Sequence, residues 1–254
     1  MKKLVLTVAT ALLLLGAVQA HTSGMVKKTC PLCKHDFTCQ LDMSGTQFGM
    51  RLDLKPLGPI TAPWRIPVCP KCRFVLYDDD IPADDLEKCK EIVHGDAYKK
   101  HSTRASHFLL GLLYEGLGKK SLEIAHVFLQ ASWQEEAEEE NLRDDLRRSL
   151  GHFDAFLKEP RRATTAVKGA EEGDDEDNSY ETAQLLKGEL LRRLGRFDKA
   201  KVHLAGLQKL KPFQGTFLAD IVRFEIALCD NKDAKPHEVS EVPREQESEP
   251  AAAP

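Results

Sequence analysis

Two Cys-Pro-x-Cys hooks constrain the fold of this chain more than any other feature. The first hook is Cys30-Pro31-Leu32-Cys33 and the second is Cys69-Pro70-Lys71-Cys72. Two such hooks present four thiolates to one ion, and a metal held in this way stabilises a small segment that has little hydrophobic core of its own. The proline inside each hook fixes one backbone angle and favours the tight turn that brings the two sulfurs together. We therefore predict one metal site with four ligands, Cys30, Cys33, Cys69 and Cys72, and zinc as the expected ion.

Two alternatives to zinc stay open at this point. Rubredoxin-like iron sites also use two hooks with an internal proline, so the hooks do not separate zinc from iron. The segment between the hooks is polar, with Phe48 and Trp64 as its main aromatic residues, and this favours zinc over a buried redox centre. In an oxidising compartment, the same thiols form a metal-free, disulfide-bridged protein.

The chain has seven cysteines, so a four-cysteine site leaves Cys39, Cys89 and Cys229 over. Cys89 and Cys229 lie in amphipathic helical patterns, where a buried and inert thiol is the usual interpretation.

The residues around the hooks predict a small β module like a zinc ribbon, which we place at residues 26–80. Met50, Leu52 and Leu54 alternate with polar residues, as in a half-buried strand. Basic residues near the hooks are expected to offset the negative charge of a four-thiolate site. Many hooks carry glycine after the second cysteine, whereas this chain has Lys34 and Arg73 there.

No residue constellation in the sequence predicts a catalytic or cofactor-binding site apart from the metal ligands. Thioredoxin-like enzymes place a Cys-Pro-x-Cys motif at the start of a helix that follows a strand, which lowers the pKa of the attacking thiol. The residues after both hooks, Lys34 to Thr38 and Arg73 to Tyr77, have the pattern of strands or turns instead. A non-enzymatic protein is therefore expected, with a thiol–disulfide protein as the alternative.

The first 20 residues have the pattern of a cleavable secretory signal peptide. Met1-Lys2-Lys3 is positively charged, Leu4 to Val18 is apolar but too short to span a bilayer, and Val18-Gln19-Ala20 has the small residues of a cleavage site. We predict cleavage after Ala20 and a mature protein in the periplasm or outside the cell, without stable membrane insertion.

The charge balance argues against a nucleic-acid-binding protein. The formal net charge is −4, and the longest charge runs are acidic, so no basic face is indicated.

The chain after residue 80 is predicted to be helical up to about Leu210, which makes the fold class mainly α. Two helical hairpins stand out, one over residues 109–133 and one over residues 183–212. In each, the first helix ends at a Leu-Gly pair, Leu117-Gly118 and Leu194-Gly195.

These hairpins resemble tetratricopeptide repeats. The segment from Leu186 to Pro212 has Gly188, Gly195, Phe197, Ala200 and Leu204 at the expected relative places, and Gly111, Tyr114 and Gly118 give a weaker copy. Together with the hooks, the chain from about Lys28 to Leu210 resembles the bacterial domain-of-unknown-function family 2225. The resemblance implies a metal-binding N-terminal part and a helical-repeat part, and it implies no settled activity.

A helical-repeat domain over residues 81–230 is expected to bind a protein or peptide partner in its inner groove. Residues 168–178 are expected to form an acidic loop, and residues 231–254 a disordered tail. The sequence therefore predicts an exported, non-enzymatic scaffold or adaptor with a metal staple.

Overall fold

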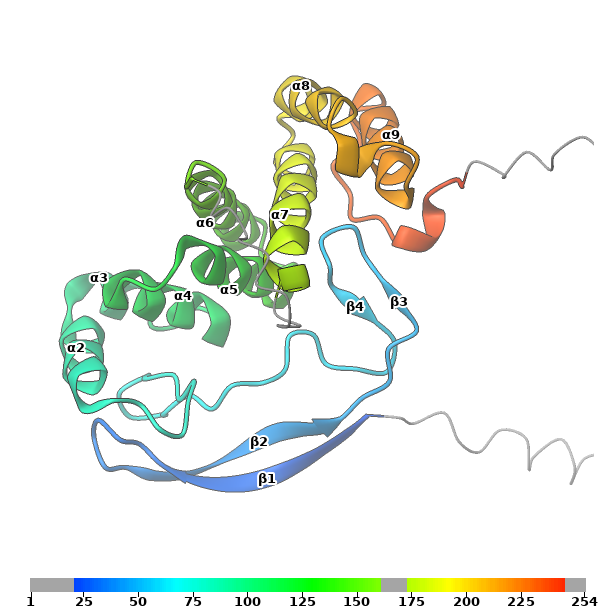
Figure 1. Cartoon of the computed structure of the whole chain (residues 1–254). Coiled ribbons are helices and arrows are strands. Elements are labelled where there is room, and N and C mark those ends of the chain that lie inside the picture. Colours follow the sequence, from blue (N-terminus) through cyan, green and yellow to red (C-terminus); the bar gives the residue numbers. More distant parts are fainter. Residues whose placement is uncertain (1–20, 161–172, 245–254) are drawn as a thin grey trace, which may run out of the picture.

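The computed structural model describes residues 21–160 and 173–244, so the predicted signal peptide at residues 1–20 lies outside the described residues. The described chain is mainly α-helical, with two small antiparallel sheets before the helices (Figure 1). The helices are α2 (Ala83–His94), α3 (Asp96–Lys100), α4 (Ser106–Leu117), α5 (Ser121–Gln134), α6 (Glu139–Phe156), α7 (Gly173–Arg193), α8 (Phe197–Leu207) and α9 (Phe217–Asp230), with short 3-10 turns at Lys211–Phe213 and Val239–Glu241.

The first sheet is a long hairpin of β1 (Thr22–Thr29) and β2 (Asp36–Ser44), and the first hook forms the turn between the strands. Side chains alternate between the two faces, so that Val26, Phe37 and Leu41 are half-buried while Met25 and Gln40 are exposed. Figure 1 shows this hairpin as a ribbon below the helices, with its hook end near α2.

The predicted half-buried strand around Met50–Leu54 is wrong. The structure has a tight hairpin there, in which β3 (Gly49–Met50) pairs with β4 (Pro56–Leu57) and Leu54 adopts a left-handed φ of 66°. Arg51 and Asp53, which alternation placed on the solvent side, are buried and form an ion pair. Asp53 also pairs with Arg193 of α7 at 3.2 Å, so the buried carboxylate is neutralised by a second element.

The two predicted helical hairpins are present as α4–α5 and α7–α8. Gly118 and Gly195 end the first helix of each with a left-handed φ, 68° and 72°, as helix-terminating glycines do. Gly111 and Gly188 each lie directly against the second helix, where an added Cβ would come within 2.6 Å of the Phe128 ring and 2.4 Å of Leu204. Glycine therefore permits the close helix contact in both hairpins. The likeness to tetratricopeptide repeats stays a prediction.

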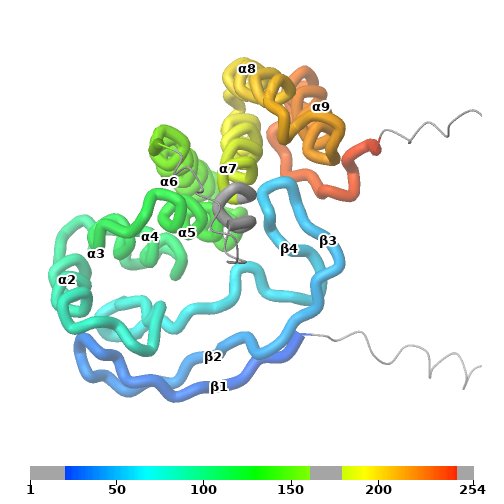
Figure 2. Tube along the Cα trace, viewed as in Figure 1, coloured from blue at the N-terminus to red at the C-terminus, as the bar shows by residue number. Residues whose placement is uncertain are grey.

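Two large apolar cores hold the helices together. One core lies among α5 to α9 and includes Leu150, Phe153, Leu190 and Leu204, all buried. The other joins α2 and α4 to both hooks. In the trace of Figure 2, α7, α8 and α9 are grouped at one end.

Two predicted loop segments differ from the structure. Helix α7 begins at Gly173, so residues 173–178 of the predicted acidic loop have a helical backbone, while residues 168–172 lie outside the described part.

The predicted disorder of residues 231–254 is wrong for residues 231–244. Leu52 N–H donates to His237 O at 2.9 Å, Arg51 forms a β-bridge with Glu238, and Val242 is buried against Leu52 and Leu228. Main-chain pairing with the β3–β4 hairpin therefore orders a segment whose composition lacks periodicity. Residues 245–254 lie outside the described part.

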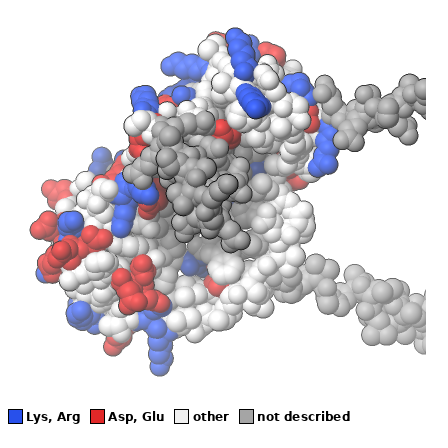
Figure 3. Space-filling model, viewed as in Figure 1, with Lys and Arg blue, Asp and Glu red and all other residues white. Residues whose placement is uncertain are grey.

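Within residues 21–160 and 173–244, every helix is too short or too polar to cross a bilayer. On the face shown in Figure 3, basic and acidic side chains are interspersed over the surface.

Candidate metal centre

The two hooks fold into turns with the same hydrogen-bond pattern. In the first, Cys30 N–H donates to His35 O and Lys34 N–H donates to Cys30 O, both at 2.9 Å. In the second, Cys69 N–H donates to Phe74 O and Arg73 N–H donates to Cys69 O, again at 2.9 Å. The hooks are thus two copies of one local structure, which matches the prediction that proline pre-shapes a tight turn.

The residues that replace the usual glycine adopt the glycine conformation. Lys34 has a φ of 55° and Arg73 a φ of 63°, both in the left-handed region. This backbone turns the following amides toward the sulfurs, and the N–H groups of His35 and Phe74 donate to the thiols of Cys33 and Cys72. The absent glycines therefore leave the hook geometry unchanged.

The structure brings the four predicted ligands together. The sulfur atoms of Cys30, Cys33, Cys69 and Cys72 all lie within 4.8 Å of one another. Two of the separations between the hooks are 3.6 Å, from Cys30 to Cys72, and 3.5 Å, from Cys33 to Cys69. A tetrahedral ion with Zn–S bonds of 2.3 Å requires sulfur atoms about 3.8 Å apart. A disulfide needs about 2.05 Å, and all four thiols are free.

The four thiols do not share one environment. Cys30 and Cys69 are fully buried, while Cys33 and Cys72 are half-buried. Burial raises the pKa of Cys30 and Cys72. Burial also opposes ionisation of Cys33, but the His35 amide and the neighbouring thiols outweigh it, so that the pKa of Cys33 falls below its ordinary value. Without a metal, Cys33 therefore ionises more readily than Cys30 or Cys72, and a bound cation would favour deprotonation of all four thiols.

Helices α2, α3 and α4 support the site from one side. Phe74 and Val75, directly after the second hook, are buried in the apolar core that also contains Cys89, Leu109 and Leu113. Tyr98 of α3 donates its hydroxyl hydrogen to Arg73 O at 2.8 Å and so fixes the left-handed residue of the second hook. The hooks depend on the helical part for much of their packing.

Two of the basic residues expected near the sulfurs have other partners. Lys28 pairs with Asp79 at 2.6 Å, and Arg73 donates from Nε to Ser102 O at 2.7 Å. Lys28 and Arg73 therefore offset the negative charge of the sulfurs only in part, because both side chains also interact with other groups.

The remaining three cysteines lie apart from the four-sulfur group. The Cys39 thiol donates to Val26 O within the long hairpin at 3.7 Å, and Cys89 contacts the Tyr77 hydroxyl at 3.9 Å. Cys229 is buried in α9. Burial of Cys89 and Cys229 agrees with the prediction from their helical patterns.

Four thiolates form a soft donor set that suits zinc or iron. Both hooks lie on turns, and neither precedes a helix that could lower a thiol pKa through its N-terminus. The arrangement therefore fits a four-coordinate metal with no open position, which is the structural type of site. Sequence reasoning named the four cysteines that the structure brings together but missed the left-handed conformation of Lys34 and Arg73, for which the glycine usual at these positions was the available signal.

Comparison of the chain with protein-family models, with curated proteins and with solved structures gave no match.

Proposed function

We propose that this protein is an exported, non-enzymatic adaptor whose N-terminal module is stapled by one zinc ion. Cys30, Cys33, Cys69 and Cys72 hold the ion, and the helical part binds a protein partner. The observation that carries the proposal is the pair of equivalent hooks with four sulfurs within 4.8 Å. Assignment to the domain-of-unknown-function family 2225, with tetratricopeptide-like repeats, belongs to this proposal and rests on the sequence resemblance.

A structural role for the metal is supported by where the hooks lie in the chain. The first hook closes the β1–β2 hairpin, and the second follows the segment that crosses from β4 toward α2. A shared ion thus links two segments far apart in sequence, and because the unfolded chain has no preformed site, the binding free energy stabilises the folded state.

A thiol–disulfide protein is the second candidate, because Cys33 combines partial exposure with a lowered pKa. Two Sγ pairs from different hooks lie close together, Cys30 with Cys72 at 3.6 Å and Cys33 with Cys69 at 3.5 Å. Oxidation of either pair would link the hooks to each other. A rubredoxin-like iron carrier is the third candidate and would absorb visible light.

The first test is metal content and free-thiol count on protein purified from the exported compartment without added metal. We expect one zinc per chain and protection of the four hook thiols from alkylation until a chelator is added. The Cys33→Ser variant should lose metal, while the matched Cys39→Ser variant should keep it, because Cys39 lies outside the four-sulfur group. A metal-free protein with bridged hooks would overturn the zinc staple, and a coloured protein would identify iron.

A further inference from the structure

A surface pocket of about 480 Å³ lies between the segment that leads to the second hook and the helices α4 and α5. We call residues 54–66 the strap, because they cross these helices on their way to Cys69. The strap supplies one wall of the pocket, and His107 of α4 with Gln130 and Trp133 of α5 supply the other. The volume lies within the range of about 300–1,000 Å³ that is typical of ligand sites.

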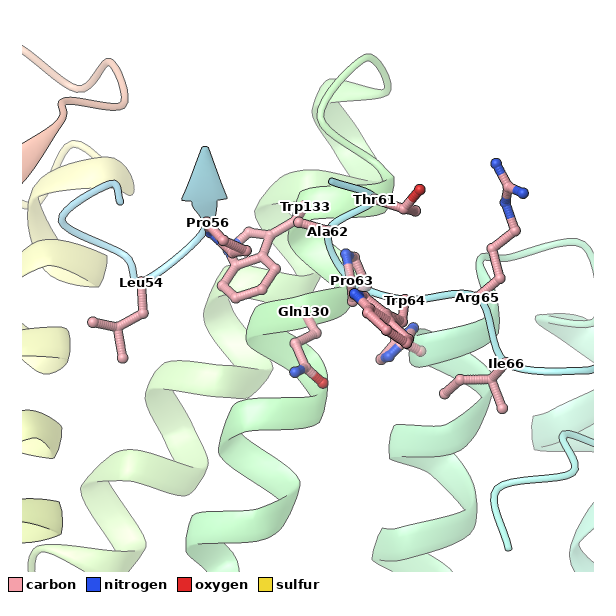
Figure 4. Close-up of a pocket in the computed structure, with 11 residues that line it drawn as sticks. Leu54, Pro56, Thr61, Ala62, Pro63, Trp64, Arg65, Ile66, Gln130 and Trp133 are labelled. Atoms are coloured by element: carbon pink, nitrogen blue, oxygen red, sulfur yellow. The ribbon is translucent and has the colours of Figure 1, made fainter. Parts of the chain in front are cut away.

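The two tryptophans of the chain, Trp64 and Trp133, both line this pocket. In the view of Figure 4, the Gln130 side chain lies between the two indoles, with Pro56 close to Trp133 and Pro63 close to Trp64. Trp64 is 48% exposed, which is unusual for so large an apolar side chain. Two indole rings and two proline rings are therefore among the groups that a ligand in this pocket would contact.

The polar side chains that line the pocket are neutral or, in the case of Arg65, paired with a carboxylate. Arg65 points away from the pocket in Figure 4, and its guanidinium pairs with Asp42 at 3.4 Å. His107 is buried, and desolvation lowers its pKa to about 4, so the imidazole is neutral at pH 7. None of the lining residues carries a carboxylate. The described lining residues consequently present no unpaired charge to a ligand, which suits an uncharged ligand.

The indole N–H of Trp133 has no acceptor among the described residues, although its Nε1 atom is buried. A buried donor without a partner destabilises the folded state. A ligand carbonyl oxygen that hydrogen-bonded to this N–H would relieve that cost, and Nε1 has to become exposed for the contact to form. Trp133 is thus a lining residue that lacks an acceptor within the described part of the chain.

We propose that this pocket binds a proline-rich peptide in the polyproline II conformation. Such a peptide has proline rings that pack on tryptophan, and its carbonyl oxygens are free because the helix has no internal hydrogen bonds. Proline brings no backbone N–H, so the ligand adds acceptors and few donors, which complements the unpaired Trp133 N–H. A saccharide would also stack on indole rings, but its many hydroxyl donors favour carboxylate acceptors, and the pocket lining has none.

The inference rests on the adaptor function proposed above and names the class of partner. The strap is held at its C-terminal end, where Asp42 accepts from Arg65 N–H at 2.8 Å and where Leu76 N–H, beyond the second hook, donates to Pro67 O at 2.8 Å. A metal in the hooks would therefore fix this end of the pocket wall.

The test is a titration of the full purified protein with decaproline, followed by intrinsic fluorescence. Because both tryptophans line the pocket, their emission reports occupancy directly. We expect a saturable change with decaproline, and none with a glycine–serine peptide of equal length or with cellohexaose. No saturable change with decaproline, an equal change with the glycine–serine peptide, or binding of cellohexaose alone would overturn the proposal.

Calorimetry on variants locates the site. Trp64→Ala should weaken decaproline binding at least about tenfold. Trp133→Phe, which keeps a ring but loses the N–H, should weaken it about fivefold. Phe48→Ala removes an aromatic ring that is 78% exposed and does not line the pocket, so binding should stay unchanged. Unaltered binding by Trp64→Ala, with far-UV circular dichroism like that of the original chain, would also overturn the proposal.

The outcomes separate the two proposals. If a metal-free protein binds decaproline, the result supports the peptide pocket and contradicts the zinc site. If a zinc-loaded protein does not bind decaproline, the result supports the zinc site and contradicts the peptide pocket.

Discussion

At Lys34 and Arg73, the turn of each hook constrains the backbone conformation more than it constrains the type of side chain. Both adopt the left-handed conformation that favours glycine, which costs a residue with a Cβ about 1–2 kcal/mol. The hook requires this conformation because the next amide must face a sulfur. The Tyr98 hydroxyl and the Ser102 carbonyl hold the backbone and side chain of Arg73, whereas Lys34 is exposed.

Replacement of Lys34 by glycine should therefore stabilise the zinc-loaded protein. Glycine removes the free-energy cost of the left-handed conformation in the folded state, and this gain is larger than the free energy that its extra freedom gives the unfolded chain. The net gain in unfolding free energy is at most about 1 kcal/mol. Lys34→Val should destabilise, since a branched side chain tolerates a positive φ poorly. Urea unfolding in the presence of zinc measures both.

The control is Lys71→Gly, inside the second hook and outside the left-handed region, which should bring no gain. Equal unfolding midpoints for all three variants and the original chain would contradict the strain argument.

Asp145 is a buried carboxyl group that shares one guanidinium with two other acids. Arg104 lies 2.7 Å from Asp145, 3.2 Å from Asp144 and 2.6 Å from Glu135. The short distance to Asp145 indicates an ion pair, yet burial, with Glu135 adding to it, raises the pKa of Asp145 to about 9. One cation does not neutralise three carboxylates, and Asp145 is the most deeply buried, so we place the proton there.

The Asp145→Asn variant should therefore gain stability relative to the original chain as pH rises. The folded-state pKa of about 9 lies above the unfolded value of about 3.9. The folded state therefore holds the proton more tightly, and the unfolding free energy of the original chain decreases as the pH rises from the lower to the higher of these values. Asparagine imitates the protonated acid and does not titrate, so the variant does not show this decrease. At pH 8.5 we expect the variant to be about 1–3 kcal/mol more stable, with a smaller difference at pH 5.

Urea unfolding at the two pH values checks this dependence. Asp144→Asn serves as the matched control, because Asp144 is partly exposed and its change should give no such slope. A stability difference for Asp145→Asn that is flat or shrinks with pH would place the proton elsewhere.

At the scale of helices, the glycines of the two hairpins have separable roles. Gly118 and Gly195 end helices with open space around them, while Gly111 and Gly188 lie in contact with a neighbouring helix. The first pair needs the backbone freedom of glycine, and the second needs its small size.

Gly111→Ala should lower the unfolding free energy by about 1–3 kcal/mol, since the new methyl group would lie 2.6 Å from the rigid and fully buried Phe128 ring. Gly151→Ala in α6 is the matched control. Its Cβ would meet nothing within 4 Å, and the higher helix propensity of alanine should raise stability by about 0.5–1 kcal/mol. Thermal unfolding compares the two, and a stabilising Gly111→Ala would contradict the close-contact role.

Local signals explain which elements the sequence predicts. The two helical hairpins follow from apolar periodicity and terminating glycines, and the grouping of the four hook cysteines follows from hook spacing. The β3–β4 hairpin escaped prediction because period-two alternation over Met50–Leu54 also occurs where a chain turns back. Its turn depends on Arg193 and His237, which are remote in sequence. The same remote pairing orders residues 231–244, so composition alone gave the wrong result there.

On the scale of the whole molecule, the C-terminal segment closes the structure back onto the N-terminal half. Residues 231–244 pass from α9 to the β3–β4 hairpin, where Leu52, Leu228 and Val242 form a small apolar cluster. The fully buried Arg192 of α7 donates to Asp233 O at 2.7 Å and to Lys235 O at 2.9 Å. The segment thus covers a buried cation and an apolar surface together.

Removal of this segment should destabilise the helical part as well as the hairpin. In a chain that ends at Lys232, two N–H groups of Arg192 lose their protein acceptors and the Leu52 cluster becomes exposed. We expect the unfolding free energy to be about 3–5 kcal/mol lower than in a chain that ends at Arg244.

The point variant Val242→Ala tests only the contribution of apolar burial to this loss. Val202→Ala is its control, because Val242 is 6% exposed and Val202 is 77% exposed. Amide hydrogen exchange should become faster in α7 and in residues 49–57 of the shortened chain. It should stay unchanged in the β1–β2 hairpin, whose strands pair only with each other. Equal exchange rates in α7 for both chains would mean that the hydrogen bonds from Arg192 to Glu189 are enough to hold Arg192 without the C-terminal carbonyls.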